Sequence, residues 1–307
     1  MKIGILGAGA LGSAVGGSLA LAGNDVELWD INEAHMKAVN DNGLKFDAAD
    51  GGHVVPLFAC RPEEGQAQDL IILMTKTCDS DAALKSARRH IDNGAMVMSA
   101  QNGLGNDARL AAYVPKEQLL YGCTMMPARF LDLGHVASQT AGRIVFGAHD
   151  AAALEKASEF AQSSQHFTLD FAPDRADIVI WQKAAFNCGI NAVSALTGGQ
   201  IKTLADSQDA RELVQAVASE VVAVARASGV KAEYQPVFDH LAKSMAKHGE
   251  HKASMLQDIE GKRPTEIDSL CAEVARQGQE LGVPTPLNQA LATLVTLKSD
   301  ALNGDTQ

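Results

Sequence analysis

The sequence predicts an α/β fold, in which an N-terminal Rossmann-type domain over residues 1–171 precedes an all-helical C-terminal domain over residues 172–307. A short apolar run at the start of the chain leads directly into a glycine-rich turn and then into a helical stretch. Apolar runs with the length of buried strands recur until about residue 171, where long amphipathic helical patterns replace them. A chain of 307 residues is also long enough for two domains.

The glycine-rich turn follows the apolar run of residues 1–6 and reads Gly7-Ala8-Gly9-Ala10-Leu11-Gly12. A G-x-G-x-x-G spacing between a strand and a helix is typical of dinucleotide-binding turns. The first glycine permits the bend, the second lets a pyrophosphate approach the backbone, and the third lets the helix pack closely on the strand. Unpaired N–H groups and the dipole at the helix start attract the phosphates. We therefore expect this turn to bind a dinucleotide; an ordinary glycine-rich turn is the alternative.

Composition and charge exclude several other classes of protein. The chain is 46% hydrophobic and 21% charged, and 37 acidic against 26 basic residues give a net charge of −11, which disfavours nucleic acids and anionic membranes as partners. No apolar run approaches the length of a membrane span, and we expect no secretory signal ahead of the first strand. The five cysteines form no C-x-x-C pair, so we expect no metal, and reduced thiols in a cytoplasmic protein.

The second predicted strand, over residues 26–29, ends at Asp30. The helix before it follows Gly12 and runs to about residue 22. In a dinucleotide-binding fold a carboxylate at this position can hold the 2′ hydroxyl of the adenosine ribose. It would repel a 2′-phosphate, and the next residues, Ile31 and Asn32, supply no arginine to receive one. The alternative is that Asp30 caps a helix that starts near residue 33, and the two roles are compatible.

Two continuous apolar runs, over residues 70–74 and 96–99, predict strands buried on both faces of a parallel sheet. Because ligands bind beyond the carboxyl ends of such strands, we expect Lys76 and Asn102 to face the glycine turn. The alternatives are a solvated lysine and a turn residue before Gly103. Further strands are predicted over residues 119–121, 143–146 and 166–169, with a helix over residues 151–162.

In the helical half, the stretch of residues 181–191 carries Lys183, Asn187 and Asn191 at i, i+4 and i+8, which places them on one helix face. Burying these groups without partners is costly, so they line a wet cleft or a ligand satisfies them; a polar surface stripe is the alternative. Other helices are predicted over residues 209–228, 234–247, 265–281 and 287–302.

A second polar stretch in this half runs over residues 254–268. Ser254 lies on one helix, which Gly261 ends, and Pro264 suits the first turn of the next. Glu266 would then stand in that first turn, where the helix dipole keeps a carboxylate ionised. The alternative is an ordinary acidic residue at a helix start.

Together these stretches resemble the ketopantoate reductase (2-dehydropantoate 2-reductase) family, in the family's order and over nearly the whole chain. The glycine motif is shared with many families, whereas the lysine–asparagine helix combined with the serine-to-glutamate stretch is far more specific. The matching landmarks are residues 7–12, Lys76, residues 101–105, Lys183 with Asn187 and Asn191, residues 254–258 and residues 265–268.

The resemblance implies a Rossmann domain followed by a helical domain, and reduction of ketopantoate to pantoate on the route to pantothenate and coenzyme A, usually with NADPH. It implies that Lys183 is the general acid and that Glu266, the second residue of the catalytic pair, contacts the cofactor. It also implies that Asn102 touches both cofactor and substrate, and that the substrate is held by Asn187, Asn191 and Ser254. The cofactor-binding residues would be those of the glycine turn, Asp30, Lys76, Asn102 and Glu266.

Two departures from the family pattern limit the assignment. Members that prefer NADPH often carry a basic residue where Asp30 stands here, so we predict that NADH is used at least as well as NADPH. Residues 123–127 and 196–200 also differ, which leaves open whether the substrate is ketopantoate or another branched 2-keto acid.

The competing functions are a 2-hydroxyacid dehydrogenase on the same scaffold and a dinucleotide-sensing protein without catalysis. The expected partner is a small-molecule 2-keto acid, with a homodimer as an open option.

Overall fold

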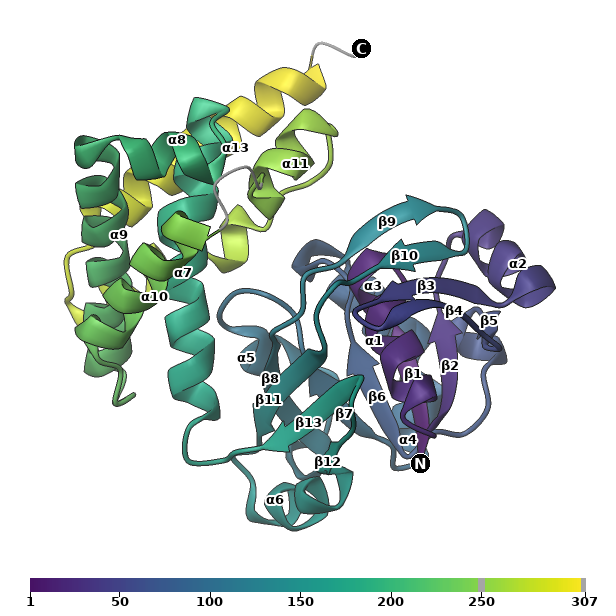
Figure 1. Ribbon diagram of the computed structural model, residues 1–307. Helices are drawn as coiled ribbons and strands as arrows, with labels where there is room; N and C mark the ends of the chain where they lie inside the picture. Colours follow the sequence, from purple (N-terminus) through teal and green to yellow (C-terminus); the bar gives the residue numbers. More distant parts are fainter. Residues whose placement is uncertain (248–251, 305–307) are drawn as a thin grey trace. The chain divides into compact units, whose positions relative to one another are not determined.

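The computed structural model describes residues 1–247 and 252–304, which divide into two compact units (Figure 1). The sheet unit comprises residues 1–101 and 106–176, and the helical unit comprises residues 102–105 and the chain from residue 177 onward. The turn of residues 102–105 therefore belongs with the helical unit. A single boundary along the chain, as the sequence suggested, does not describe this division.

The main sheet of the first unit has the strand order β12-β13-β11-β8-β7-β6-β1-β2-β5. Its neighbours pair in parallel except β8 with β11 and β12 with β13. This largely parallel sheet confirms the predicted fold class, and all the predicted strands are present. The strands are β1 (Lys2–Leu6), β2 (Asp25–Trp29), β5 (Phe58–Cys60), β6 (Leu70–Leu73), β7 (Met96–Ser99), β8 (Leu119–Thr124), β11 (Gly142–Gly147), β12 (Gln162–Ser163) and β13 (Phe167–Phe171).

Strand β6 shows why its sequence is apolar without alternation. Leu70 and Ile72 face one core, and Ile71 and Leu73 face the core on the opposite side of the sheet. All four side chains are fully buried. Because successive side chains of a strand point to opposite faces, a strand covered on both sides needs an apolar residue at every position.

The sequence did not predict the second sheet of this unit, which has the order β4-β3-β10-β9. Strands β3 (Leu44–Ala48) and β4 (Gly51–Val55) form a hairpin, and β3 pairs in parallel with β10 (His135–Ala137). The outer strand β9 (Arg129–Asp132) is exposed throughout and pairs with β10.

Helix α1 (Ala10–Leu21) packs against strands of both sheets, as the ribbon in Figure 1 shows. It is therefore buried on opposite sides, and its residues from Gly12 to Leu19 are inaccessible. The predicted helix over residues 151–162 is shorter than expected, because the chain turns into β12 after it. The other helices of the unit are α2 (Glu33–Asn42), α3 (Ser80–Ser86), α4 (Arg88–Asp92), α5 (Asn106–Leu110) and α6 (Ala151–Ala157).

The helical unit encloses its own core of Val, Ile, Leu and Ala side chains. The predicted helices are present except that the one over residues 265–281 is broken near its start. The helices are α7 (Ala176–Thr197), α8 (Ile201–Asp206), α9 (Gln208–Ala227), α10 (Tyr234–Lys247), α11 (Ser254–Glu260), α12 (Cys271–Leu281) and α13 (Pro286–Gly304), with a short 3₁₀ helix over Ile267–Ser269.

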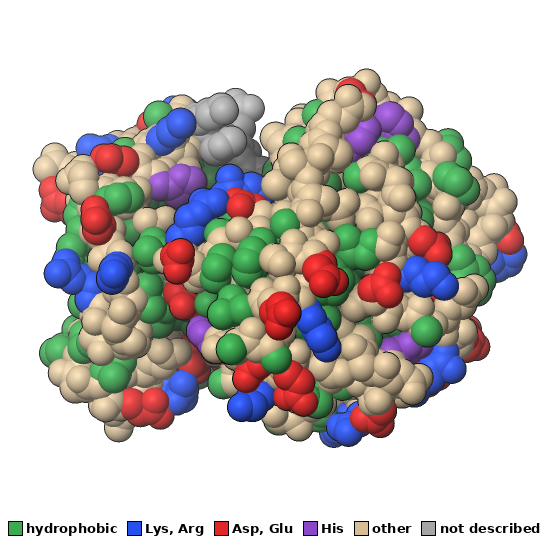
Figure 2. Space-filling view, turned by 90° about the horizontal axis from the view of Figure 1, so that it is seen from below, with side chains coloured by type: hydrophobic (Ala, Val, Ile, Leu, Met, Phe, Trp, Pro, Cys, Tyr) green, Lys and Arg blue, Asp and Glu red, His purple; other side chains and the backbone are tan. Residues whose placement is uncertain are grey.

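The surface carries charges of both signs. Figure 2 shows acidic and basic side chains mixed over the face that it draws. Within residues 1–247 and 252–304, none of the helices has the length and apolar character needed to cross a bilayer.

Glu220 on α9 caps the start of α13. Its carboxylate accepts hydrogen bonds from the backbone N–H groups of Leu287 at 3.0 Å and Asn288 at 2.9 Å, and from the Asn288 amide at 2.8 Å. The first N–H groups of a helix have no partner within the helix, so a carboxylate supplied by another helix both satisfies them and complements the dipole.

Replacing Glu220 by alanine should lower the free energy of unfolding of the helical unit by about 2–3 kcal/mol, since three donors, two of them on the fully buried Asn288, lose a charged acceptor. Urea unfolding followed by circular dichroism measures the change. The matched control is Glu212→Ala on the exposed side of the same helix, with an expected loss of at most about 0.5 kcal/mol. Equal losses in the two variants would contradict the capping role.

Candidate active site

The glycine turn joins β1 to α1 with very little space around it. Gly7 has φ +102°, and a Cβ there would lie 2.6 Å from the backbone nitrogen of Thr75. A Cβ on Gly12 would lie 1.9 Å from the carbonyl oxygen of Gly7. The bend and the close packing of helix on strand therefore both require glycine, as the spacing predicted.

Gly9 differs from the other two glycines because its surroundings are open. The residue is exposed, and apart from its two chain neighbours none of the described residues comes within 4 Å of a Cβ placed on it. The N-terminus of α1 has no side-chain cap, and its first turn carries no acidic residue. Such a helix start suits an anionic diphosphate, so the chain here fits the phosphates of a dinucleotide.

Asp30 lies directly after β2 and is partly buried. Its Oδ1 accepts the N–H groups of Ile31 at 2.8 Å and Asn32 at 2.9 Å, which fixes the carboxylate against its own loop. Helix α2 is capped instead by the side chain of Asn32, which accepts the N–H of His35 at 3.1 Å. The alternative role of Asp30 as the cap of this helix is therefore wrong, and contact with the ribose stays a prediction.

Strand pairing brings an arginine near Asp30 that the local sequence did not reveal. The N–H of Asp30 donates to the carbonyl of Cys60 at 3.2 Å, and Arg61 follows directly. The Arg61 guanidinium forms an ion pair with Glu33 at 2.8 Å. A cationic side chain therefore lies near this end of α2 even though residues 31–32 contain no arginine. Its charge is already neutralised by Glu33.

Lys76 follows β6 and immediately precedes a 3₁₀ turn; it is partly buried. Close by, the buried Gln101 ties the ends of two strands together. Its amide nitrogen donates to the carbonyl of Thr75 at 2.8 Å and to the hydroxyl of Ser80 at 2.9 Å, while its amide oxygen accepts from Ser99 at 3.1 Å. Gln101 therefore fixes the strand ends after which Lys76 and Asn102 emerge.

In the helical unit, α7 carries the predicted polar face. Asn187 and Asn191 are only 7% and 6% exposed, so the alternative of a polar surface stripe is wrong for these two amides. Lys183, one turn before Asn187 and two turns before Asn191, is partly buried. The Asn191 amide donates to the hydroxyl of Ser254, the first residue of α11, at 3.1 Å. Because that hydroxyl accepts from Asn191, its own proton can be donated to another group.

Asn102 and Glu266, far apart in sequence, lie together in the helical unit. The Asn102 amide donates to the Glu266 carboxylate at 3.0 Å. The adjoining backbone is held by a bond from the N–H of Leu104 to the carbonyl of Ser269 at 2.7 Å. Gly103 has φ +89°, and a Cβ there would lie 2.5 Å from the same carbonyl. The turn of residues 102–105 can therefore lie this close to Ser269 only with glycine at position 103.

The same contact corrects the predicted position of Glu266. We expected it in the first turn of a helix over residues 265–281, whereas it precedes the 3₁₀ helix of Ile267–Ser269 and α12 begins only at Cys271. The carbonyl of Ser269 is turned toward Leu104 and cannot continue an α-helical ladder. The break presents Glu266 to Asn102.

The predicted site residues therefore fall into two sets. The glycine turn, Asp30 and Lys76 belong to the sheet unit, whereas Lys183, Asn187, Asn191, Ser254, Glu266 and Asn102 belong to the helical unit. Within the helical set, two hydrogen-bonded pairs accompany Lys183 and Asn187. A meeting of Lys183 with a cofactor held by the glycine turn stays a prediction.

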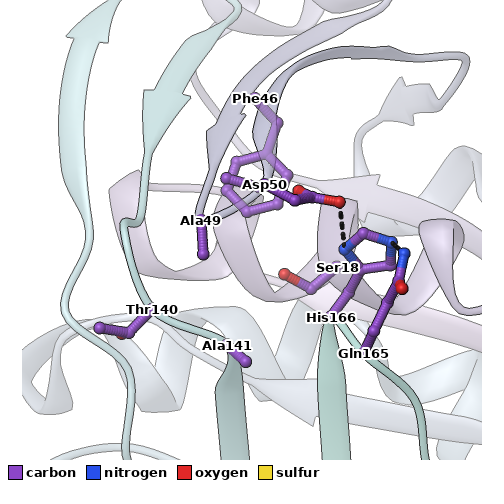
Figure 3. Close-up of a pocket in the computed structure, with 9 residues that line it drawn as sticks. Ser18, Phe46, Ala49, Asp50, Thr140, Ala141, Gln165 and His166 are labelled. Atoms are coloured by element: carbon purple, nitrogen blue, oxygen red, sulfur yellow. Dashed lines mark hydrogen bonds and ion pairs between the residues drawn. The ribbon is translucent and has the colours of Figure 1, made fainter.

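A cavity elsewhere in the sheet unit contains none of these residues (Figure 3). It has a volume of about 90 Å³, and Asp50 and His166 form an ion pair at 3.8 Å on its wall. This volume is far below the several hundred cubic ångströms of ordinary ligand pockets, so the cavity cannot hold a dinucleotide.

The buried Cys188 on α7 is not suited to act as a nucleophile. Burial raises the pKa of the Cys188 thiol well above its ordinary value, which keeps it protonated and unreactive. In residues 1–247 and 252–304, no group of three His, Cys, Asp or Glu side chains is arranged to hold a metal ion. The side chains of the predicted site residues instead offer amides, one hydroxyl, two carboxylates and two ammonium groups.

Comparison with known proteins gives a consistent result over the whole chain. The family model of ketopantoate reductase PanE/ApbA matches residues 3–151, and the model of its C-terminal part matches residues 177–299. The 2-dehydropantoate 2-reductase of Halobacterium salinarum is 32% identical over 303 residues, covering 97% of this chain and 98% of the relative. That of Pyrococcus abyssi is 32% identical over 308 residues and covers 99% of each.

Among solved structures, a ternary complex of D-mandelate dehydrogenase with NADH and anilino(oxo)acetate is similar, with a TM-score of 0.91 and 28% identity over 99% of this chain and all of that chain. Matches to both parts of the family model, and relatives of more than 30% identity over nearly the full length, leave one conclusion: the chain belongs to the ketopantoate reductase family.

Proposed function

We propose that the protein is a nicotinamide-dependent reductase of a 2-keto acid, with ketopantoate as the substrate and pantoate as the product. The observation that carries the proposal is the set of hydrogen-bonded polar groups in the helical unit, which accompanies Lys183 in a chain that also has a complete dinucleotide turn. The names of the relatives support the same reaction.

In this proposal the phosphates of the cofactor lie at the start of α1, beside Gly9, and Asp30 receives the adenosine ribose. Lys76, at the end of β6, adds a positive charge for the phosphates. When bound, the reduced cofactor supplies the hydride that the keto carbon accepts. Because a fixed carboxylate accepts hydrogen bonds and repels phosphate, Asp30 favours the 2′ hydroxyl of NADH over the 2′-phosphate of NADPH.

Lys183 has the chemistry required of the proton donor. The keto oxygen gains negative charge as its carbon is reduced, and an ammonium group within hydrogen-bond reach both stabilises that charge and transfers a proton to it. Asn187 and Asn191 offer donors and acceptors for the substrate hydroxyl groups, and Ser254 can donate to its carboxylate. Glu266 fixes the amide of Asn102, so that the Asn102 oxygen and the rest of the Glu266 carboxylate can contact the cofactor.

The second candidate is a dehydrogenase of another 2-hydroxy acid. The similarity to D-mandelate dehydrogenase, a protein whose solved complex contains NADH and an oxo acid, favours this alternative specifically. Both functions use the same hydride and proton transfers and differ only in the side chain of the substrate. A dinucleotide-sensing protein without catalysis is less well supported, because it would have no use for a lysine beside two buried amides.

A panel of keto acids separates these functions. Ketopantoate should give a higher kcat/KM than phenylglyoxylate or an unbranched 2-keto acid, measured as oxidation of NADH and NADPH. A preference for phenylglyoxylate would support the second candidate. Binding of a reduced cofactor without turnover of any keto acid would support the sensor.

Lys183→Ala should lower kcat by about 10²- to 10⁴-fold, because the developing oxyanion loses its proton donor. The dissociation constant of the reduced cofactor should change little. Lys202→Ala, which removes an exposed lysine from α8, is the matched control and should retain the activity of the parent protein. Turnover near the parental value in Lys183→Ala would rule out the proposed role.

Asp30→Ala should raise the ratio of kcat/KM for NADPH to that for NADH by about tenfold, because the repulsion of the 2′-phosphate and the acceptor for the ribose are both lost. The parent protein should use NADH at least as well as NADPH. Asp25→Ala, at the exposed start of the same strand, serves as the control and should leave the ratio unchanged. A parent protein with a strong NADPH preference would refute this assignment of Asp30.

A further inference from the structure

His35 is a buried histidine that joins three elements of the sheet unit. It lies in the first turn of α2 and is 1% exposed. Its Nδ1 lies 3.0 Å from the backbone nitrogen of Gly134, in the turn between β9 and β10, and its Nε2 lies 3.1 Å from the hydroxyl of Ser13 on α1. The ring of Phe130 packs against it, with the ring centroids 5.1 Å apart.

The partners on both sides fix the same tautomer. The N–H of Gly134 can only donate, so Nδ1 must be the acceptor and carries no proton. The Ser13 hydroxyl donates its single proton to the carbonyl oxygen of Ala8 at 2.8 Å, so it must accept from His35, and Nε2 carries the proton. The chain of donors therefore runs from Gly134 to His35, and from His35 through Ser13 to Ala8, with a neutral ring.

The last bond of this chain acts on the glycine turn. Ala8 and Gly9 share one peptide group, and among the described residues no peptide bond is cis. In a planar trans peptide the C=O and N–H bonds point in opposite directions. When Ser13 holds the carbonyl of Ala8, it therefore turns the N–H of Gly9 the other way, away from Ser13.

We propose that His35, acting through Ser13, is a positioning residue that aims the N–H of Gly9 at the diphosphate of the bound cofactor. This inference rests on the proposed binding of a nicotinamide dinucleotide at the glycine turn. It adds a residue that the glycine motif does not contain, and it makes binding depend on the protonation state of a side chain that touches neither cofactor nor substrate.

The dependence on protonation follows from the geometry. A proton on Nδ1 would face the N–H of Gly134. Because two donors cannot bond to each other, the ring would lose its hydrogen bond to Gly134. Burial lowers the pKa of His35, while the negative charge of Asp30 opposes the change. The other groups that contact the ring, from α1 and from the β9–β10 hairpin, are Ser13, Phe130 and Gly134, which carry no charge.

The sign of the effect is therefore defined. With a pKa below the ordinary value of about 6.5, the ring stays neutral at neutral pH and the turn is held. Cofactor affinity should be constant above about pH 7 and should fall as the pH drops through the lowered pKa.

The test measures the dissociation constant of NADH, or of NADPH if that is bound more tightly, from cofactor fluorescence on the full chain. Two substitutions of His35 separate its two bonds. The amide nitrogen of glutamine can take the place of Nε2, so His35→Gln keeps a donor for Ser13. The amide oxygen of asparagine can take the place of Nδ1, so His35→Asn keeps the acceptor for Gly134 and loses Ser13.

At about pH 8, Ser13→Ala and His35→Asn should raise the dissociation constant about 5- to 10-fold, the effect of one lost hydrogen bond, and His35→Gln should stay within about twofold of the parent protein. Ser18→Ala is the matched control, because Ser18 is a buried serine of the same helix whose hydroxyl has no partner among the described residues. It should bind the cofactor as the parent does. Circular dichroism shows that each variant is folded.

As the pH falls below 7 and through the lowered pKa of His35, the parent protein should lose affinity, by up to about tenfold per pH unit, whereas His35→Gln should follow a flatter curve because its amide does not titrate. Groups that bind the cofactor directly titrate in both proteins, so the difference between the curves belongs to His35. Parental affinity in Ser13→Ala and His35→Asn, or identical pH curves for the parent and His35→Gln, would overturn the inference. Failure of the parent to bind either cofactor would instead overturn the proposed function.

Discussion

The close approach of α1 to β1 is the constraint on which the rest of the sheet unit depends. The carbonyl of Gly7 occupies the space where a Cβ of residue 12 would stand, at 1.9 Å. Only with glycine there can the helix start so near the strand, and only a helix in this place can pack against both sheets. The burial of α1 on opposite sides then explains its small and apolar side chains. The open surroundings of Gly9 at its first turn are a product of the same geometry.

The sequence was informative where a structural requirement acts on neighbouring residues. The uninterrupted apolar run at Leu70–Leu73 indicates burial on both faces of one strand. The glycine spacing of residues 7–12 indicates the turn between β1 and α1. The i, i+4, i+8 spacing of Lys183, Asn187 and Asn191 on α7 indicates one helix face. In each case the cause and its sequence signal lie within a few residues, so the pattern could be interpreted without knowledge of the rest of the fold.

The second sheet lacked such a signal because its halves come from distant parts of the chain. Strand β3 pairs with β10, and β9 is exposed at every position, so it shows no alternation of apolar and polar residues. The turn at Ala49-Asp50 before Gly51, between two strand-like runs, was the one local cue for the hairpin. The break before α12 had no local cue, because its cause is the contact between Leu104 and Ser269.

Two hydrogen bonds fix polar groups of the helical unit that we propose bind cofactor and substrate. Each bond joins residues that are remote in sequence, Asn191 to Ser254 and Asn102 to Glu266, and is donated by the nitrogen of an asparagine amide. The second atom of each amide then has a defined direction, because the first is held. Such preorganisation lowers the entropy that substrate binding must otherwise overcome.

The proposed recognition of the ribose and the proposed positioning of the glycine turn are connected through the start of α2. Asp30, whose carboxylate is held by the loop before that helix, raises the pKa of His35 and partly offsets the lowering by burial. The carboxylate that we propose receives the ribose thus also influences the protonation of His35. Under these two proposals, a charge change at residue 30 alters both the cofactor preference and the pH below which cofactor binding weakens. A basic residue at position 30 would drive the pKa of His35 lower still and protect the neutral ring.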